Sequence, residues 1–121
     1  MKKKNFRSFQ LFVDKEVKNF KNNIYLINDQ KISKSIKFKD IDIFLKNLGN
    51  FLKNKKISEQ KKILICSNND NFTGLLLIGL IYFNRIVIPV NPAFKKEDIK
   101  YIVKNSNPDF IITEKEYDFL F

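Results

Sequence analysis

Histidine is absent from this chain of 121 residues, and cysteine occurs only once, at Cys66. These scarcities exclude a disulfide framework, a zinc finger and a serine–histidine catalytic triad. Glycine and proline are also rare, with three residues of each. All three glycines (Gly49, Gly74 and Gly79) fall inside expected helices, so the sequence has no glycine-rich loop of the kind that binds phosphate groups.

Arginine is the next scarce residue, because two arginines accompany 21 lysines in a chain whose formal net charge is +10. Nucleic-acid sites favour arginine, whose planar guanidinium makes two-point contacts with phosphate and guanine. The lysines occur with many Asn, Ile, Phe and Tyr residues, whose codons are rich in A and T. A drift in composition therefore explains the charge better than a functional basic patch does. Residues 1–62 hold 17 basic and 6 acidic residues, whereas residues 63–121 hold 6 and 7.

Hydrophobic residues make up 44% of the chain, which is enough for one buried core. In residues 1–23, apolar residues at spacings of three and four predict an amphipathic helix: Phe6, Phe9, Phe12, Val13, Val17 and Phe20. Its basic start is not followed by the apolar run of a secretory signal. Such a helix could lie on an anionic membrane, but a surface helix packed on its own domain is the preferred interpretation.

Residues 24–62 predict a hairpin followed by a helix. Residues 24–27 and 36–38 are the expected strands, and polar turn residues separate them. Asp40 is expected to cap the N-terminus of the helix, which has a clear apolar face formed by Ile41, Phe44, Leu45, Leu48, Phe51 and Leu52. Gly49 borders that face, which predicts close backbone packing there.

Residues 63–121 alternate between strands and helices. The expected strands are residues 63–66, 86–88 and 110–113, all buried, and the helix over residues 72–83 is apolar on nearly all sides. Its twelve residues rise about 18 Å, too short for a hydrocarbon core of about 30 Å. This order predicts an α/β fold: a parallel βαβαβ sheet with right-handed crossovers, preceded by the N-terminal helix and hairpin in one incomplete domain.

The stretch from Asp40 to Thr113 resembles the opening part of the adenylate-forming (AMP-binding) enzymes, the superfamily of acyl-CoA synthetases, luciferases and peptide-synthetase adenylation domains. The resemblance rests on the order of the elements and on a few letters, above all Pro89-Val90-Asn91-Pro92 after the second strand. Asn84 replaces the glycine that is usual after the buried helix. The change is mild, because asparagine also adopts the left-handed conformation at a helix end.

The resemblance implies an ATP-dependent acid–thiol ligase, which joins a small-molecule carboxylate to a thiol such as CoA through an acyl-adenylate. ATP, Mg²⁺ and CoA are the cofactors of the family, but the residues that hold them lie beyond the matched stretch. We therefore expect no catalytic, cofactor-binding or metal-binding residue in this chain. Cys66 is expected to be a core residue, and Glu97 and Asp98 are expected to begin a helix.

We expect the N-terminal fragment of such a ligase, located in the cytoplasm and not competent alone. It is either a gene fragment or one part of a split enzyme, whose remainder would then be its partner. An apolar cluster in residues 117–121 favours this interpretation. One alternative is a flavodoxin-like domain. The main alternative is a standalone, non-catalytic basic module that binds nucleic acid or an anionic membrane surface. Its contacts would be Lys2, Lys3, Lys4, Arg7, Lys53, Lys55, Lys56, Lys61 and Lys62.

Overall fold

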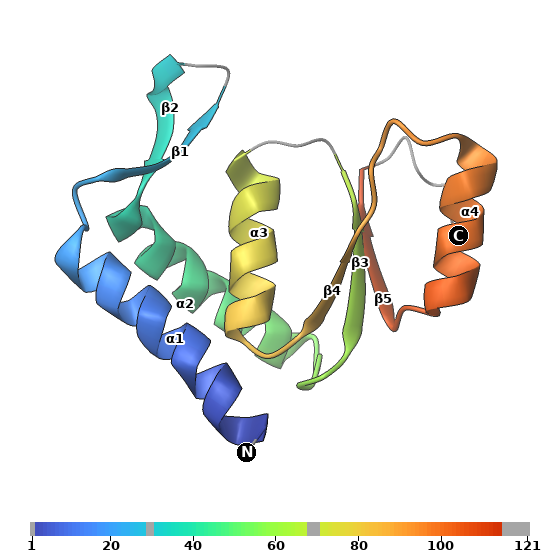
Figure 1. Cartoon of the computed structure of the whole chain (residues 1–121), viewed down its shortest axis with the longest axis horizontal. Helices are drawn as coiled ribbons and strands as arrows, with labels where there is room; N and C mark the ends of the chain where they lie inside the picture. Colours follow the sequence, from blue (N-terminus) through green and yellow to red (C-terminus); the bar gives the residue numbers. More distant parts are fainter. Residues whose placement is uncertain (1, 29–30, 68–70, 115–121) are drawn as a thin grey trace.

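The computed structural model describes residues 2–28, 31–67 and 71–114, with side chains described for residues 9–23, 35–67 and 71–114 (Figure 1). Helices and strands follow one another in this part of the chain as expected. Their bounds are α1 (Lys2–Asn19), β1 (Ile24–Asn28), β2 (Lys31–Lys37), α2 (Phe38–Asn54), β3 (Lys62–Cys66), α3 (Asn71–Tyr82), β4 (Ile86–Pro89), α4 (Lys96–Ser106) and β5 (Phe110–Thr113).

Three parallel strands form the main sheet, in the order β4-β3-β5, and β1 and β2 form a separate antiparallel hairpin. The predicted parallel α/β fold is therefore confirmed. The central strand β3 places Ile63 opposite Val87 on one side and opposite Phe110 on the other. Every residue of β3 after Lys62 is buried, as expected for a strand that is covered on both faces.

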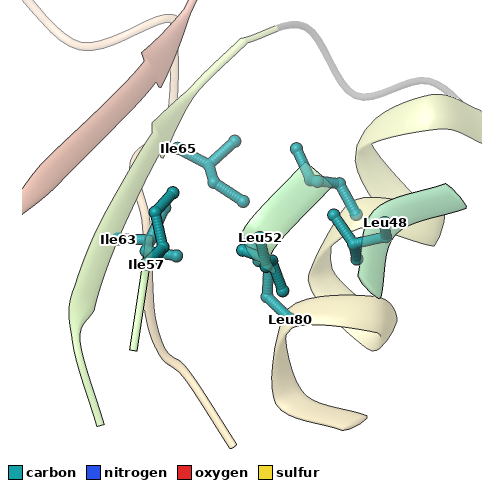
Figure 2. Packing of buried hydrophobic residues seen from close by; sticks show 7 residues of the cluster. Leu48, Leu52, Ile57, Ile63, Ile65 and Leu80 are labelled. Atoms are coloured by element: carbon teal, nitrogen blue, oxygen red, sulfur yellow. The ribbon is translucent and has the colours of Figure 1, made fainter. Parts of the chain in front are cut away.

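Helices cover both faces of this sheet, with α2 and α3 on one side and α4 on the other (Figure 1). Successive side chains of a strand point to opposite faces. Ile63 and Ile65 accordingly pack with residues of α2 and α3, whereas Leu64 and Cys66 pack with Ile99 of α4. Figure 2 shows the first of these clusters, in which side chains of β3, α2 and α3 meet.

Helices α2 and α3 approach each other closely through two glycines. A Cβ atom built on Gly79 would overlap Leu48 Cδ2 and would lie 3.0 Å from Phe44 Cε1. A Cβ atom on Gly49 would lie 3.0 Å from Phe83 Cζ. The close packing expected at Gly49 is confirmed, and the neighbour there is an aromatic ring.

Helix α1 packs on its own domain, which supports the preferred interpretation of this segment. Val13 is buried with Ile41 of α2 and Leu75 of α3. The stripe is narrower than predicted, because Phe12 is 59% exposed and Phe20 is 44% exposed. Phe6 of the predicted stripe lies outside the described side chains.

Asp40 is not the N-cap of α2, so that prediction is wrong. The helix begins at Phe38, and Asp40 is its third residue. From there the Asp40 Oδ2 atom accepts a hydrogen bond from the Lys37 N–H at 2.9 Å. The carboxylate still binds an N–H group at the helix start. The N–H group belongs to the residue three positions before Asp40, as it does for the acidic residue of a capping box.

Two expectations about burial are also wrong. Strands β4 and β5 are edge strands, and Ile86 and Phe110 are 43% and 37% exposed. The apolar helix α3 is buried on one side only, because Phe72 is 60% exposed and Ile81 is 44% exposed. The sequence shows that these residues are apolar, but their burial depends on neighbours that the described part of the chain does not supply.

No helix among the described residues is long and apolar enough to cross a membrane.

Candidate functional site at the carboxyl edge of the sheet

The carboxyl ends of β3, β4 and β5 meet at one edge of the parallel sheet. The chain runs from β3 to β4 by way of α3 and then crosses to the other side of β3 by way of α4. The order of strands therefore reverses between β3 and β5. In open α/β sheets ligands bind beyond the carboxyl ends of the strands at such a point, so the candidate site lies beyond Cys66 and Thr113.

Hydroxyl groups at this edge bind other groups of the chain. The Ser67 and Thr73 hydroxyl oxygens lie 2.9 Å apart and share a hydrogen bond, which links the end of β3 to the first turn of α3. Thr73 is 6% exposed. The Thr113 hydroxyl donates to the carbonyl oxygen of Cys66 at 2.9 Å and so links the ends of β5 and β3. These bonds fix the backbone at the edge of the sheet.

The Pro89-Val90-Asn91-Pro92 segment shapes the turn that leads into α4. The Val90 N–H donates to the carbonyl oxygen of Ile65 at 2.9 Å, and the Val90 side chain is buried. The Asn91 Oδ1 atom accepts a hydrogen bond from the Ala93 N–H at 2.9 Å, which forms a local Asx turn. The segment that most resembles the family, Pro89-Val90-Asn91-Pro92, therefore makes structural contacts through Val90 and Asn91.

The other residues considered as candidates occupy the places expected of them. Cys66 is fully buried beneath α4, as a core residue. Glu97 and Asp98 lie in the first turn of α4, where the helix dipole favours negative charge, and both are exposed. Asn84 follows α3 with a φ of 61°, the left-handed conformation that replaces the usual glycine.

Charged side chains are few at the carboxyl edge in the part of the chain that the structure describes. Within those residues, no three His, Cys, Asp or Glu side chains come together in a way that could hold a metal ion. The side chains of Cys66, Ser67, Thr73 and Thr113 carry no charge, and Glu114 is the acidic residue that follows β5. That the chain lacks cofactor-binding residues as a whole remains a prediction.

The basic residues of the alternative function lie in three stretches of the chain. Lys53 lies in the last turn of α2, and Lys55 and Lys56 follow it. Lys61 precedes β3 and Lys62 begins it, at the opposite edge from the candidate site. The Lys62 Nζ donates to the carbonyl oxygen of Ser106 at 3.3 Å, and the Lys61 Nζ lies 3.8 Å from Asp109 Oδ1. Lys2, Lys3, Lys4 and Arg7 belong to α1, but their side chains lie outside the described ones.

A hollow between α1 and α2 also contains lysines, but its charge is mixed. Lys18, Lys21 and Lys39 border it together with Asp14 and Asp42. The two carboxylates offset most of the positive charge with which such a hollow could attract phosphate groups. This hollow therefore does not favour the basic-module alternative.

Arg85 and Tyr82 have structural roles that the sequence did not predict. The Arg85 guanidinium donates to the carbonyl oxygens of Phe83 and Ile57, and desolvation by burial lowers its pKa. Burial and the hydrogen bond from its hydroxyl to Asp14 raise the pKa of Tyr82 to about 12. The rarity of arginine is the signal that could have singled out Arg85, because a lysine in this lysine-rich chain would not span two carbonyl groups.

This arrangement of helices on a parallel sheet agrees with the comparison with known proteins. A family model described as "AMP-binding enzyme" matches residues 13–119. The chain therefore belongs to the AMP-binding, adenylate-forming enzymes, and the resemblance in the sequence is confirmed.

Solved structures share this fold at low sequence identity. An artificially fused adenylation–PCP di-domain, NpsA-ThdA from Klebsiella oxytoca, is 16% identical with a TM-score of 0.78. The match covers 87% of this chain and 19% of that chain. A benzoate CoA ligase from Burkholderia xenovorans is 13% identical with a TM-score of 0.75, over 90% of this chain and 22% of that chain. This chain therefore spans about a fifth of the length of these proteins.

A curated protein gives a weaker match. The polyketide synthase PksN of Bacillus subtilis is 20% identical over 81 residues, which are 67% of this chain and 2% of that protein. Adenylate-forming folds thus occur in solved structures both as ligases and within multidomain synthetases.

Proposed function

We propose that this chain forms the opening part of the N-terminal subdomain of an ATP-dependent acid–thiol ligase of the acyl-CoA synthetase type, and that it is not catalytic alone. One observation carries the proposal. The chain matches the NpsA N-terminal subdomain of Klebsiella oxytoca over 88% of its own length, but over only 27% of that subdomain, with a TM-score of 0.78. A chain that corresponds to one part of a larger subdomain gives this difference between the two coverages.

The proposed reaction has two steps, and neither is assigned to residues of this chain. A carboxylate oxygen of the substrate attacks the α-phosphorus of ATP, which forms the acyl-adenylate and releases pyrophosphate. The thiol sulfur then attacks the acyl carbon, which forms the thioester and releases AMP. We assign ATP, Mg²⁺ and CoA to the remainder of the enzyme, because the hydroxyl groups of Ser67 and Thr113 at the carboxyl edge bind other groups of this chain.

The role proposed for this chain is to build one end of the sheet and to fix the edge of β3 and β5. The hydrogen bond from Thr113 to Cys66 and the one between Ser67 and Thr73 hold the strand ends in place. Such bonds position a backbone without touching substrate. A cytoplasmic location is part of the proposal, because a chain with a single cysteine gains nothing from an oxidising compartment.

The proposed substrate is a small-molecule carboxylate. Solved relatives of this fold include a complex of the Klebsiella oxytoca NpsA subdomain with 3-hydroxybenzoyl-AMSN and a benzoate CoA ligase. Another relative is described as a putative long-chain-fatty-acid CoA ligase from Rhodopseudomonas palustris. At 13–16% identity these relatives support the reaction class and leave the acyl group open.

ATP–pyrophosphate exchange tests the proposal directly. The purified chain of 121 residues is assayed with benzoate, anthranilate and a long-chain fatty acid, after circular dichroism has shown that it is folded. We expect no exchange above the protein-free control. Exchange that depends on one of these acids would contradict the proposal that the chain is not catalytic alone.

No observation on the described residues favours the basic-module alternative. A binding titration with duplex DNA and with anionic vesicles, repeated at increasing salt, checks it. Tight binding that weakens steeply with salt would support that alternative against the ligase proposal.

A further inference from the structure

Helices α1, α2 and α3 meet around an apolar hollow with a volume of about 140 Å³. Three aromatic rings line it, those of Phe9 and Phe12 from α1 and that of Phe38 from α2. Val13 and Ile41 also line it and are 7% and 3% exposed, so they form its inner wall. Among the described residues, the hollow shares none with the carboxyl edge of the sheet.

Two hydrogen bonds on another side of α1 keep the hollow open. The carbonyl oxygen of Tyr82 accepts from Gln10 Nε2 at 2.7 Å, and the Tyr82 hydroxyl donates to Asp14 Oδ1 at 2.9 Å. Helix residues four positions apart lie on the same side. Gln10 and Asp14 therefore share one side of α1, whereas Phe12 and Glu16 share another. Helix α1 cannot rotate to close the hollow without breaking both bonds.

The size and the walls of the hollow suit one aromatic ring. Apolar protein cavities of roughly 150 Å³ stay dry and bind benzene, and this hollow has nearly the same volume. Aromatic rings also attract one another in edge-to-face and offset arrangements. Phe12 is 59% exposed, so one wall of the hollow borders the solvent and a ligand can enter beside it.

Glu16 gives the hollow a negative charge. It is the polar residue of the lining among the described residues, and it is half-buried. A carboxylate attracts an ammonium group and repels another carboxylate, and apolar walls strengthen both effects because they exclude water. Apolar walls with one carboxylate therefore select a ring that carries an amino group.

We propose that this hollow between α1, α2 and α3 is a binding site for a small aromatic amine. The ring lies against the phenylalanine rings of the hollow, and the ammonium group lies at Glu16. This ligand differs from the carboxylate proposed as the substrate of the ligase, and the inference does not rest on that function. Binding stabilises the packing of α1 on α2 and α3, because a ligand that binds only the folded protein raises its stability.

Three ring compounds of similar size test the charge preference of the hollow. Benzylamine, benzyl alcohol and benzoate carry a positive, no and a negative charge at neutral pH. NMR titration of the purified chain of 121 residues measures their dissociation constants and shows which amide signals shift. We expect benzylamine to bind at least about threefold more tightly than benzyl alcohol and at least about tenfold more tightly than benzoate. The signals of α1 and α2 around the hollow should shift most.

The variant Glu16→Gln tests the role of the carboxylate. We expect it to bind benzylamine no more tightly than benzyl alcohol, because the amide carries no charge. Glu97→Gln is the matched control, since Glu97 is exposed on α4 and lies outside the lining. This control should keep the preference of the parent chain for benzylamine.

The variant Ile78→Phe tests the location of the site. Ile78 lines the hollow from α3, so a larger side chain there takes up part of its volume. Ile81→Phe is the matched control in the same helix, because Ile81 is 44% exposed and lies outside the lining. Circular dichroism first shows that both variants are folded. We expect Ile78→Phe to weaken benzylamine binding by at least about tenfold and Ile81→Phe to leave it unchanged.

The other outcomes overturn the proposal. They are binding of benzoate as tight as that of benzylamine, a preference for benzylamine that survives Glu16→Gln, and equal binding of benzylamine by the two α3 variants. The absence of any shifted signal at about 10 mM benzylamine, well above the dissociation constant that so small a ligand can reach in such a hollow, would overturn it as well.

Discussion

Arg85 binds the carbonyl oxygen of Ile57 through its Nη2 atom and the carbonyl oxygen of Phe83 through Nη1. The guanidinium thereby links the turn after α3 to the loop before β3. Ile57 is buried in the same cluster as Ile63 and Leu80. The bond therefore fixes the amino edge of the sheet at the point where the hydrophobic core ends.

We expect Arg85→Lys to lower the free energy of unfolding by about 1–3 kcal/mol, because one ammonium group cannot reach both carbonyl oxygens and one buried acceptor loses its partner. Urea denaturation followed by circular dichroism measures the change. Lys53→Arg, an exchange at an exposed position of α2, is the control and should change stability by less than about 0.5 kcal/mol. Equal stability of Arg85→Lys and the parent chain would contradict this role.

Gly79 allows α2 and α3 to approach each other closely, and substitution of Gly79 by alanine tests this contact. Alanine there would overlap Leu48 Cδ2, and overpacking of this kind costs about 1–3 kcal/mol. Alanine also gains about 1 kcal/mol in helix propensity over glycine, so the expected net loss is up to about 2 kcal/mol. Thermal and urea unfolding of Gly79→Ala, Leu48→Ala and the double variant measure the coupling. We expect the double variant to lose less stability than the sum of the single losses, and simple additivity would show that the two side chains do not meet.

The elements that could be predicted from the sequence are those whose pattern is complete within the chain. The apolar face of α2 and the continuous run in β3 specify a helix and a covered strand, and the structure places Leu48, Leu52 and Ile65 in one core. The exposure of Ile86 and Phe110 could not be predicted in the same way. An apolar residue on a strand is buried only if another strand or helix lies next to it, and periodicity within the strand carries no information about that neighbour.

At the candidate site, too, the sequence predicts some features, whereas others depend on the tertiary fold. The sequence locates the carboxyl ends of the strands, and from composition it predicts the absence of a phosphate-binding loop. It does not show that the Thr113 hydroxyl bonds to Cys66, because residues 47 positions apart in the chain meet only through the strand order β4-β3-β5. The family resemblance compensates in part, since a shared order of elements implies a shared order of strands.

Asp40 illustrates how a correct chemical inference can fall at the wrong position. Its carboxylate accepts the Lys37 N–H at 2.9 Å from the third position of α2. We expect Asp40→Ala to lower the free energy of unfolding by about 1 kcal/mol, the usual size of an N-terminal capping interaction. Asp42→Ala is the control, because Asp42 forms an exposed ion pair with Lys46 at 3.3 Å, and such pairs contribute about 0–1 kcal/mol. Chemical denaturation of the two variants compares them, and a larger loss for Asp42→Ala would contradict the capping role.

Tyr82 joins α1 to α3, since its hydroxyl donates to Asp14 Oδ1 at 2.9 Å and its carbonyl oxygen accepts from Gln10 Nε2 at 2.7 Å. Burial, together with this hydrogen bond and the charge of Asp14, raises the pKa of Tyr82 to about 12 from its usual 10.0. Between these two values the unfolded chain releases the phenolic proton while the folded chain keeps it. The contribution of Tyr82 to stability is therefore fully present below pH 10 and is lost as the pH rises toward 12.

Unfolding of the parent chain and of Tyr82→Phe between pH 9 and 12 tests this dependence. The lysines titrate in the same range, so the measured quantity is the difference in unfolding free energy between the two proteins at each pH. We expect Tyr82→Phe to be the less stable protein at pH 9, because Asp14 loses its donor, and the difference to shrink toward pH 12. Tyr101→Phe, at an exposed side chain, should follow the parent chain throughout. A difference between Tyr82→Phe and the parent that stays constant with pH would show that the phenolic proton of Tyr82 does not hold α1 against α3.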